Sequence, residues 1–219
     1  MDTLLRAGLL AFVAVLLNGC SSLAATSYDT IRLAIVGPDS VITTDYVNSL
    51  DRPALSARLK QSEALLILAS GTDGIAEWHG LSQALVTQNG RVIQSAGLPE
   101  QADVIAPLLP DDPFLRDLRT LETDLEVTRQ VDLPARYLTG VPQRAQYRTG
   151  PLEKRQIMGV ERELLRLDEA ISMPTIGFKA VNHYWLDQAS GKVVASTQHL
   201  APDLPALHLV ELHQTVKQP

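Results

Sequence analysis

The chain has 219 residues and a formal net charge of −6, and 45% of its residues are hydrophobic. This apolar fraction is ordinary for a globular protein, and the length suits one large domain or two small ones. The mildly acidic charge argues against binding to nucleic acid or to anionic lipid head groups by charge alone. The sequence holds one cysteine, which excludes a disulfide within the chain, so stability must come from packing.

The N-terminal segment has the layout of a bacterial lipoprotein signal. Arg6 supplies a weak positive charge, an apolar run extends from Ala7 to Leu17, and the small residue Gly19 precedes Cys20. The run is too short to cross a bilayer, which takes about 20 residues. This layout predicts a signal peptide of residues 1–19, cleavage between Gly19 and Cys20, and acylation of Cys20 by palmitate-type chains.

A lipid on Cys20 would hold the mature protein on a membrane, where each buried methylene contributes about 0.8 kcal/mol and stable anchoring needs more than one chain. Ser21 stands where an aspartate would favour retention in the inner membrane, so we expect the periplasmic face of the outer membrane. Two alternatives stay open. An ordinary signal-peptidase site at Ser22-Leu23-Ala24 would discard Cys20 and release a periplasmic protein, or Cys20 could be a buried structural cysteine.

Two short helices are expected first. Residues 27–36 place their apolar side chains on one helical face, and Gly37-Pro38 would end that helix. A second helix is expected over Asp45–Leu50, capped by Thr43 or Thr44.

Strand signals follow. Ala64–Ala69 is a continuous apolar run, which is consistent with a buried strand, and Gly71–Gly74 is expected to form a turn. Asn89-Gly90 lies between the apolar segments 84–86 and 92–93. This pair predicts a two-residue hairpin, because both turn residues need positive φ.

Four prolines within residues 97–113 interrupt the strand pattern, since each proline lacks a backbone donor. We therefore expect residues 100–121 to connect two halves of one domain, with a turn of helix at Phe114–Leu121. Alternating apolar residues over 125–133 then predict a strand.

The C-terminal part is expected to contain a hairpin turn at residues 187–191 and a last strand at Leu207–Leu212. Residues 152–171 fit two patterns. Their apolar positions slightly favour a helix, although part of the segment alternates like a strand, with a break at Glu169. Gly159 would cost a helix about 1 kcal/mol relative to alanine and is equally at home at a bulge.

Two blocks of the sequence resemble a known family. Residues 57–98 contain ALLILASG, Trp78 within WHGLS, and the Asn89-Gly90 hairpin, and residues 182–212 contain YWLD before an SGK turn. Their order and spacing are similar to those of the YjbF/GfcB family of outer-membrane lipoproteins. Genes of that family lie among genes for exopolysaccharide or group 4 capsule production.

The resemblance implies a mainly β fold, in which a large antiparallel sheet is curled as a half-barrel with a few short helices. It favours strand over helix for residues 152–171 and a single β-rich domain over residues 20–219. It implies a role in the export or assembly of extracellular or capsular polysaccharide, and it supplies no catalytic residues.

No catalytic or metal site is predicted. Ser70-Gly71 lacks the glycine that stands two residues before a serine nucleophile. His208, Glu211 and His213 are close in sequence, but strand alternation would turn His208 away from the other two. Acidic residues interleave with Arg and Lys, which is typical of a solvated face rather than of a glycosidase pair. These clusters are Asp111-Asp112, Glu122–Glu126 and Glu161–Glu169.

Trp78 and Trp185 are the candidate contacts for a glycan. Tyr184 and Trp185 would face opposite sides of one strand, so at least one of them is expected in the core. We expect no cofactor apart from the lipid on Cys20 and no enzymatic activity. The expected partners are the membrane, other polysaccharide-export proteins and polysaccharide itself, but not nucleic acid.

Two other functions stay open. A carrier of a lipid or acyl ligand would need a continuous apolar lining on the concave face of the half-barrel. A glycan hydrolase would need two carboxylates in a cleft, one of them with a raised pKa.

Overall fold

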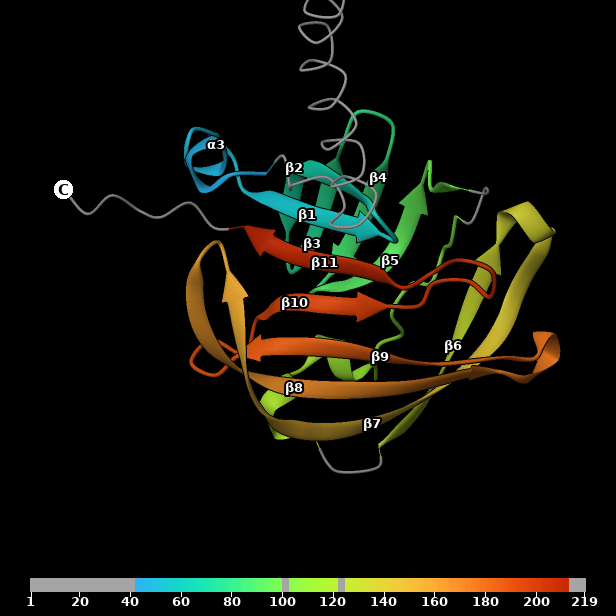
Figure 1. Ribbon diagram of the computed structural model, residues 1–219. Helices are drawn as coiled ribbons and strands as arrows, with labels where there is room; N and C mark the ends of the chain where they lie inside the picture. Colours follow the sequence, from blue (N-terminus) through green and yellow to red (C-terminus); the bar gives the residue numbers. More distant parts are fainter. Residues whose placement is uncertain (1–41, 100–102, 122–124, 213–219) are drawn as a thin grey trace, which may run out of the picture. The chain divides into compact units, whose positions relative to one another are not determined.

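The computed structural model describes residues 42–99, 103–121 and 125–212 (Figure 1). The helix expected over residues 27–36 lies outside them. The regular elements are α3 (Thr44–Asn48), β1 (Ala54–Leu59), β2 (Ser62–Thr72), β3 (Ile75–His79), β4 (Ala84–Gln88), β5 (Arg91–Ala96), β6 (Glu126–Leu133), β7 (Leu138–Ile157), β8 (Val160–Met173), β9 (Phe178–Asp187), β10 (Val193–Gln198) and β11 (Leu207–Leu212). Single turns of 3₁₀ helix lie at Pro113–Leu115 (η2), Leu118–Thr120 (η3), Pro134–Arg136 (η4) and Pro174–Ile176 (η5).

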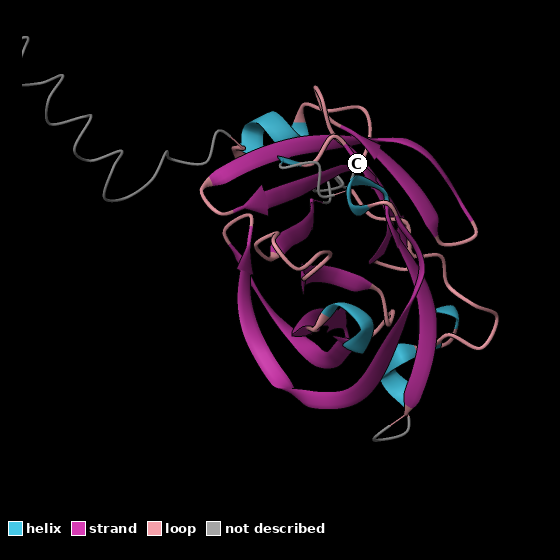
Figure 2. Cartoon of the chain, turned by 90° about the vertical axis from the view of Figure 1, so that its right-hand side faces the viewer, coloured by secondary structure: helices cyan, strands magenta, loops and turns pink. Residues whose placement is uncertain are grey.

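The strands form one eleven-stranded sheet in the order β5-β4-β3-β2-β1-β11-β10-β9-β8-β7-β6. All pairings are antiparallel, and the last strand, β11, lies beside the first, β1, in the middle of the sheet. The strands curve around an interior as a half-barrel, which confirms the expected fold (Figure 2). Within the described residues, no helix has the length and apolar character needed to cross a bilayer.

Several local predictions are confirmed. The side chain of Thr43 accepts a hydrogen bond from the Tyr46 backbone and caps α3, which is shorter than the expected helix. The β4–β5 turn has φ of 49° at Asn89 and 87° at Gly90, as an Asn-Gly hairpin requires. The strand predicted at Leu207–Leu212 is β11. The turn expected over Gly71–Gly74 is shorter, because β2 continues to Thr72.

Residues 152–171 are strand, so the helical periodicity was misleading. The segment contains the end of β7, a two-residue turn at Met158-Gly159 and most of β8. Ile157 and Leu164 pack on the convex side against Trp185, whereas Leu167 and Ile171 pack on the concave side. Apolar residues on both faces of a strand pair produced the spacing that resembles a helix.

The segment between β5 and β6 joins the two edges of the sheet. Ile105 forms isolated bridges to Gln94 of β5 and to Asp132 of β6. The backbone amide of Ile105 donates to the Asp132 carbonyl at 3.1 Å, and the Asp132 amide donates back at 2.8 Å. We call residues 103–121 the strap. Its first residues close the gap between the two edge strands.

Side chains fill part of the concave face. Leu66, Leu85, Val131 and Leu207 belong to a large apolar cluster that draws on both halves of the sheet. A second cluster forms where Phe114 and Leu118 of the strap pack on the inner face of β7–β9. On the convex side, α3 and the β7–β8 turn cover β1 and β11.

Two turn glycines differ in how closely the rest of the fold packs against them. Gly90 and Gly159 both have positive φ, but a Cβ on Gly90 would lie 2.4 Å from Val193 Cβ, whereas nothing lies within 4 Å of one on Gly159. We expect Gly159→Ala to destabilise the fold by about 1 kcal/mol through backbone strain alone. Gly90→Ala should cost about 1–3 kcal/mol more, because the β4–β5 turn must move off β10.

Urea unfolding followed by circular dichroism measures both free energies. Equal losses for Gly90→Ala and Gly159→Ala would contradict the contact between the β4–β5 turn and Val193.

Candidate functional site

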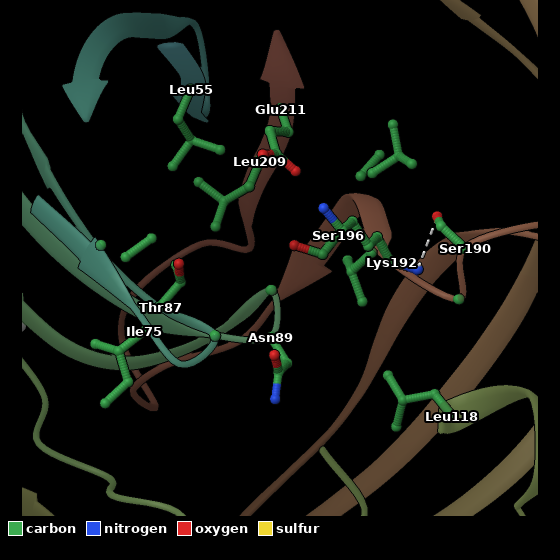
Figure 3. Close-up of a pocket in the computed structure, with 18 of the residues that line it drawn as sticks. Leu55, Ile75, Thr87, Asn89, Leu118, Ser190, Lys192, Ser196, Leu209 and Glu211 are labelled. Carbon is green, nitrogen blue, oxygen red and sulfur yellow. Dashed lines mark hydrogen bonds between the residues drawn. The ribbon is translucent and has the colours of Figure 1, made fainter. Parts of the chain in front are cut away.

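A cavity of about 690 Å³ opens on the concave face, at the end where the β2–β3, β4–β5 and β9–β10 turns meet (Figure 3). Its wall comes from β1, β2, β3, β10 and β11, and the strap residues 115–119 complete its rim. The volume falls within the range of about 300–1,000 Å³ that is usual for small-molecule sites.

The wall of the cavity is apolar. Leu55, Leu68 and Leu209 contribute aliphatic side chains, and Trp78 lies among them with only 4% of its surface exposed. The Trp78 Nε1 group donates to Thr87 Oγ1 at 2.9 Å, so its polar atom is satisfied within the sheet. Trp78 therefore forms part of the wall rather than an open platform for a sugar ring.

Hydrogen bonds between the turns fix the rim. The backbone N–H of Asn89 donates to the Gly74 carbonyl at 2.8 Å, which links the β4–β5 turn to the β2–β3 turn. Asn89 Nδ2 donates to the Phe114 carbonyl at 2.6 Å and so reaches the strap. These contacts order the rim before any ligand binds, which lowers the entropic cost of binding.

Hydrogen bonds from Arg119 join the strap to the β9–β10 turn. Arg119 binds the Asp117 carboxylate at 2.6 Å and donates from Nη1 to the carbonyls of Gln188 and Ala189 at 3.0 and 2.7 Å. Hydrogen bonds from the Arg119 side chain and backbone lower the pKa of Asp117 to about 2. Asp117 is therefore an anion at neutral pH and cannot serve as a general acid.

Other charged side chains at the rim face solvent. Asp73, Arg116 and Lys192 are exposed and line the cavity. Across the described parts of the chain, no ion pair engages any of these three residues. Ser196 and Thr87 also line the cavity, but both are buried, and their hydroxyls accept hydrogen bonds from Gln198 and Trp78. The site therefore combines an apolar wall with hydrogen-bonding groups at its mouth.

A second group of polar residues is buried in the concave face beside the cavity and does not line it. Arg129 is at its centre, with none of its surface exposed. Its guanidinium donates to Asp112 Oδ2 and to Glu169 Oε1, each at 2.5 Å, and also contacts the Tyr147 hydroxyl. We call this group the buried cluster. Its charged members are Arg91, Asp112, Arg129 and Glu169.

Glu169 accepts several hydrogen bonds within the buried cluster. The hydroxyls of Tyr147 and Tyr184 donate to it at 2.9 and 2.8 Å, and Asn182 Nδ2 donates at 2.8 Å. Burial alone would raise the pKa of Glu169, but the charges of Arg91 and Arg129 and the hydrogen bonds hold it well below its usual range. A saturated, ionised carboxylate of this kind is a structural group rather than a proton donor.

The expectation that Asp112 and Glu169 belong to solvated acidic faces was wrong. Glu169 shares the inward side of β8 with Leu167 and Ile171, and Asp112 is 1% exposed where the strap crosses Arg129. Their partners, Arg91 and Arg129, are distant in the sequence and are not the arginines interleaved with the acidic residues. Arg129 has the same strand parity as Val127 and Val131, so its inward position was readable from the alternation.

The other predicted residues are dispersed. Trp185 is buried on the convex side, under the Arg155 guanidinium at 3.7 Å, and its Nε1 group donates to Glu153 at 2.7 Å. Tyr184 does face the opposite side, as strand alternation predicted. His208 contacts Thr197, and His213 lies outside the described residues, as do Gly19 and Cys20. Among the residues described, no cluster of three potential metal ligands occurs.

Of the predicted glycan contacts, the structure thus brings Trp78 alone to the cavity. The sequence analysis missed the rim residues, because turns such as Asp73-Gly74 and Ser190-Gly191 were read as connections only. The tips of hairpins that meet at one end of a curled sheet carry such residues. The local sequence does not say which tips meet.

Comparison with known proteins identifies the family. A family model described as the group 4 capsule polysaccharide lipoprotein GfcB, YjbF, matches residues 28–212. The chain belongs to this YjbF family. The match covers all eleven strands and both groups of residues described above.

A solved structure supports the same fold. The hypothetical lipoprotein YmcC from Escherichia coli K12 superposes with a TM-score of 0.68 at 19% identity, covering 84% of this chain and 94% of YmcC. A Bacteroides fragilis protein with a YmcC-like fold gives a TM-score of 0.34 at 9% identity, covering 73% of this chain and 92% of that chain. No curated protein sequence matches the chain.

The buried cluster makes stability depend on the charge of Glu169. Glu169→Gln should cost about 3–5 kcal/mol at neutral pH, because Arg91 and Arg129 lose their shared anion. Since the folded-state pKa is lowered, this stabilisation is complete above the unfolded pKa of about 4.3 and is lost as the pH falls below it. The difference between wild type and variant should therefore narrow from about pH 5 to about pH 3.

Chemical denaturation across this pH range measures the difference in unfolding free energy. Glu163→Gln, at an exposed position of the same strand, is the control and should change stability little. A constant difference between wild type and Glu169→Gln down to pH 3 would contradict the assigned ion pairs.

Two neighbouring aspartates test the attachment of the strap. Asp112 binds buried Arg129, whereas Asp111 is exposed. We expect Asp112→Ala to destabilise the domain by about 3–5 kcal/mol and to open the strap to limited proteolysis, because it leaves a buried guanidinium partly unpaired. Asp111→Ala should keep the wild-type cleavage rate. Equal rates for the two variants would show that Asp112 does not hold the strap.

Proposed function

We propose that this YjbF-family lipoprotein is held at the periplasmic face of the outer membrane by a lipid on Cys20, and that it assists the export or assembly of surface polysaccharide by binding. The observation that carries the proposal is the family match over residues 28–212. The sequence Leu17-Asn18-Gly19-Cys20 supports the lipid attachment. The proposal implies that this protein contacts other proteins of the polysaccharide-export system.

Binding rather than catalysis is favoured by the chemistry of the site. A glycan hydrolase needs a protonated carboxyl group with a raised pKa, whereas Asp117 at the rim and Glu169 in the buried cluster both have lowered pKa values. The interlocked turns give the cavity a fixed shape, which suits recognition.

The alternative of a hydrophobic carrier has less support. Phe114 and Leu118 fill much of the concave face, and charged side chains stand at the mouth of the remaining cavity. A carrier would need a continuous apolar lining in that place.

Anchoring and location are tested together by two substitutions in cells. Cys20→Ala should leave the protein without a lipid, so it should be recovered in the soluble fraction or as an uncleaved precursor. Ser21→Asp should keep the lipid but move the protein to the inner membrane in density-gradient fractions. Outer-membrane recovery of Cys20→Ala would contradict the lipid anchor.

The role in export is tested by deleting the gene and measuring surface polysaccharide. We expect a reduced amount, restored by the wild-type gene and not by the Cys20→Ala variant. Unchanged polysaccharide in the deletion strain would refute the proposed process. Incubating the purified protein with the polysaccharide should leave its chain length unchanged, and shortening would show catalysis instead.

A further inference from the structure

We propose that the cavity on the concave face is a glycan-binding site that takes a short, weakly charged stretch of polysaccharide through the rim residues Asp73 and Lys192. This inference rests on the proposed function, because the family's link to capsule polysaccharide makes a glycan available. It adds the location of the site, the class of ligand and the residues that recognise it.

The charge at the rim favours a ligand with many hydroxyl groups over a strongly charged one. Six charged residues line the cavity, three acidic and three basic: Asp73, Asp117, Glu211, Arg116, Arg119 and Lys192. Asp117 and Arg119 pair with each other. A balanced rim neither attracts a polyanion nor repels a neutral ligand.

Asp73 and Lys192 are placed to bind hydroxyl groups. A carboxylate accepts from a hydroxyl, and an ammonium group donates to one, so each residue can engage a hydroxyl group of a bound glycan. Asp73 lies at the tip of the β2–β3 turn and lines the cavity. Lys192, labelled in Figure 3, lies at the end of the β9–β10 turn and lines it as well. Both side chains are exposed to solvent, so a ligand can reach their charged groups.

The cavity wall complements the less polar faces of sugar rings. The more accessible apolar side chains of the lining, half-buried Leu68 and the exposed Ile75 and Leu115, can contact ring C–H groups. Trp78 supports this wall from within the core and is not itself the contact surface. An acyl chain offers no hydrogen-bonding group to the charged side chains at the rim, whereas the hydroxyls of a glycan do.

Register shifts in two strands help to form the space. β2 shifts its pairing between Leu68 and Ser70, and β10 shifts between Val193 and Ala195. Both shifts lie at the cavity wall or next to it, where bulges commonly redirect side chains beside binding sites.

The test uses the full lipoprotein in lipid nanodiscs and isothermal titration calorimetry. The probe is a set of oligosaccharides made by partial hydrolysis of the polysaccharide from the same cells. We expect wild type to bind and the double variant Asp73→Asn, Lys192→Ala to bind at least about tenfold more weakly, because Lys192→Ala removes a charged donor and Asp73→Asn replaces a charged acceptor with a neutral one. Asparagine tolerates the positive φ of 50° at position 73, so the turn should persist.

A matched control makes the same chemical changes elsewhere. Asp111→Asn with Lys179→Ala replaces one exposed aspartate and one exposed lysine that do not line the cavity. This control should bind like wild type. A third variant, Thr72→Trp, places bulk at the rim on an exposed strand position and should weaken binding as well. Unfolding curves check that each variant folds.

Three results would overturn the inference. The first is that wild type binds no oligosaccharide. The second is that the rim variant and the matched control bind oligosaccharides equally well. The third is saturable binding of palmitate that Thr72→Trp abolishes and with which oligosaccharides do not compete. None of these three results depends on the phenotype of the deletion strain, which tests the proposed function separately. Loss of polysaccharide on deletion combined with any of them would keep the function and reject this site.

Discussion

The buried ion pairs of Arg129 hold the strap against the sheet. Arg129 joins Asp112 of the strap to Glu169 of β8, and Arg91 of β5 reaches the same carboxylate at 3.4 Å. Residues of β5, β6 and β8 thus meet at the Glu169 carboxylate, and the strap is held to them through Asp112 and Arg129. Buried charges of this kind contribute little net stability when paired and cost several kcal/mol when one is removed. They therefore fix where the strap lies, and the strap in turn completes the rim of the cavity.

The local parts of the fold were predictable because their causes are local. An Asn-Gly pair demands a two-residue turn, and prolines keep residues 97–113 out of long strands. Residues 152–171 were not predictable from periodicity, because the β7–β8 pair buries apolar residues on both faces. There the resemblance to a family supplied the correct answer.

The candidate site was harder to predict than the fold. Its rim joins turns around positions 73, 89, 117 and 190, which come together only when the sheet curls. The buried cluster depends on pairs that are 78 and 40 residues apart, and a charged residue inside a strand gives no sign of its partner. Trp78 was a correct pointer to the cavity region, although the structure assigns it to the wall.

The bridge made by Ile105 has a consequence for how the protein behaves at high concentration. An open sheet ends in two strands with unpaired backbone groups, and each can recruit a strand from another molecule and start fibrils. Here a single residue of the strap hydrogen-bonds with β6, while its neighbours bond with β5. This short crossing occupies backbone groups of both edge strands, so it shortens the stretch of each edge that another molecule could pair with, with fewer residues than a fully closed barrel would require.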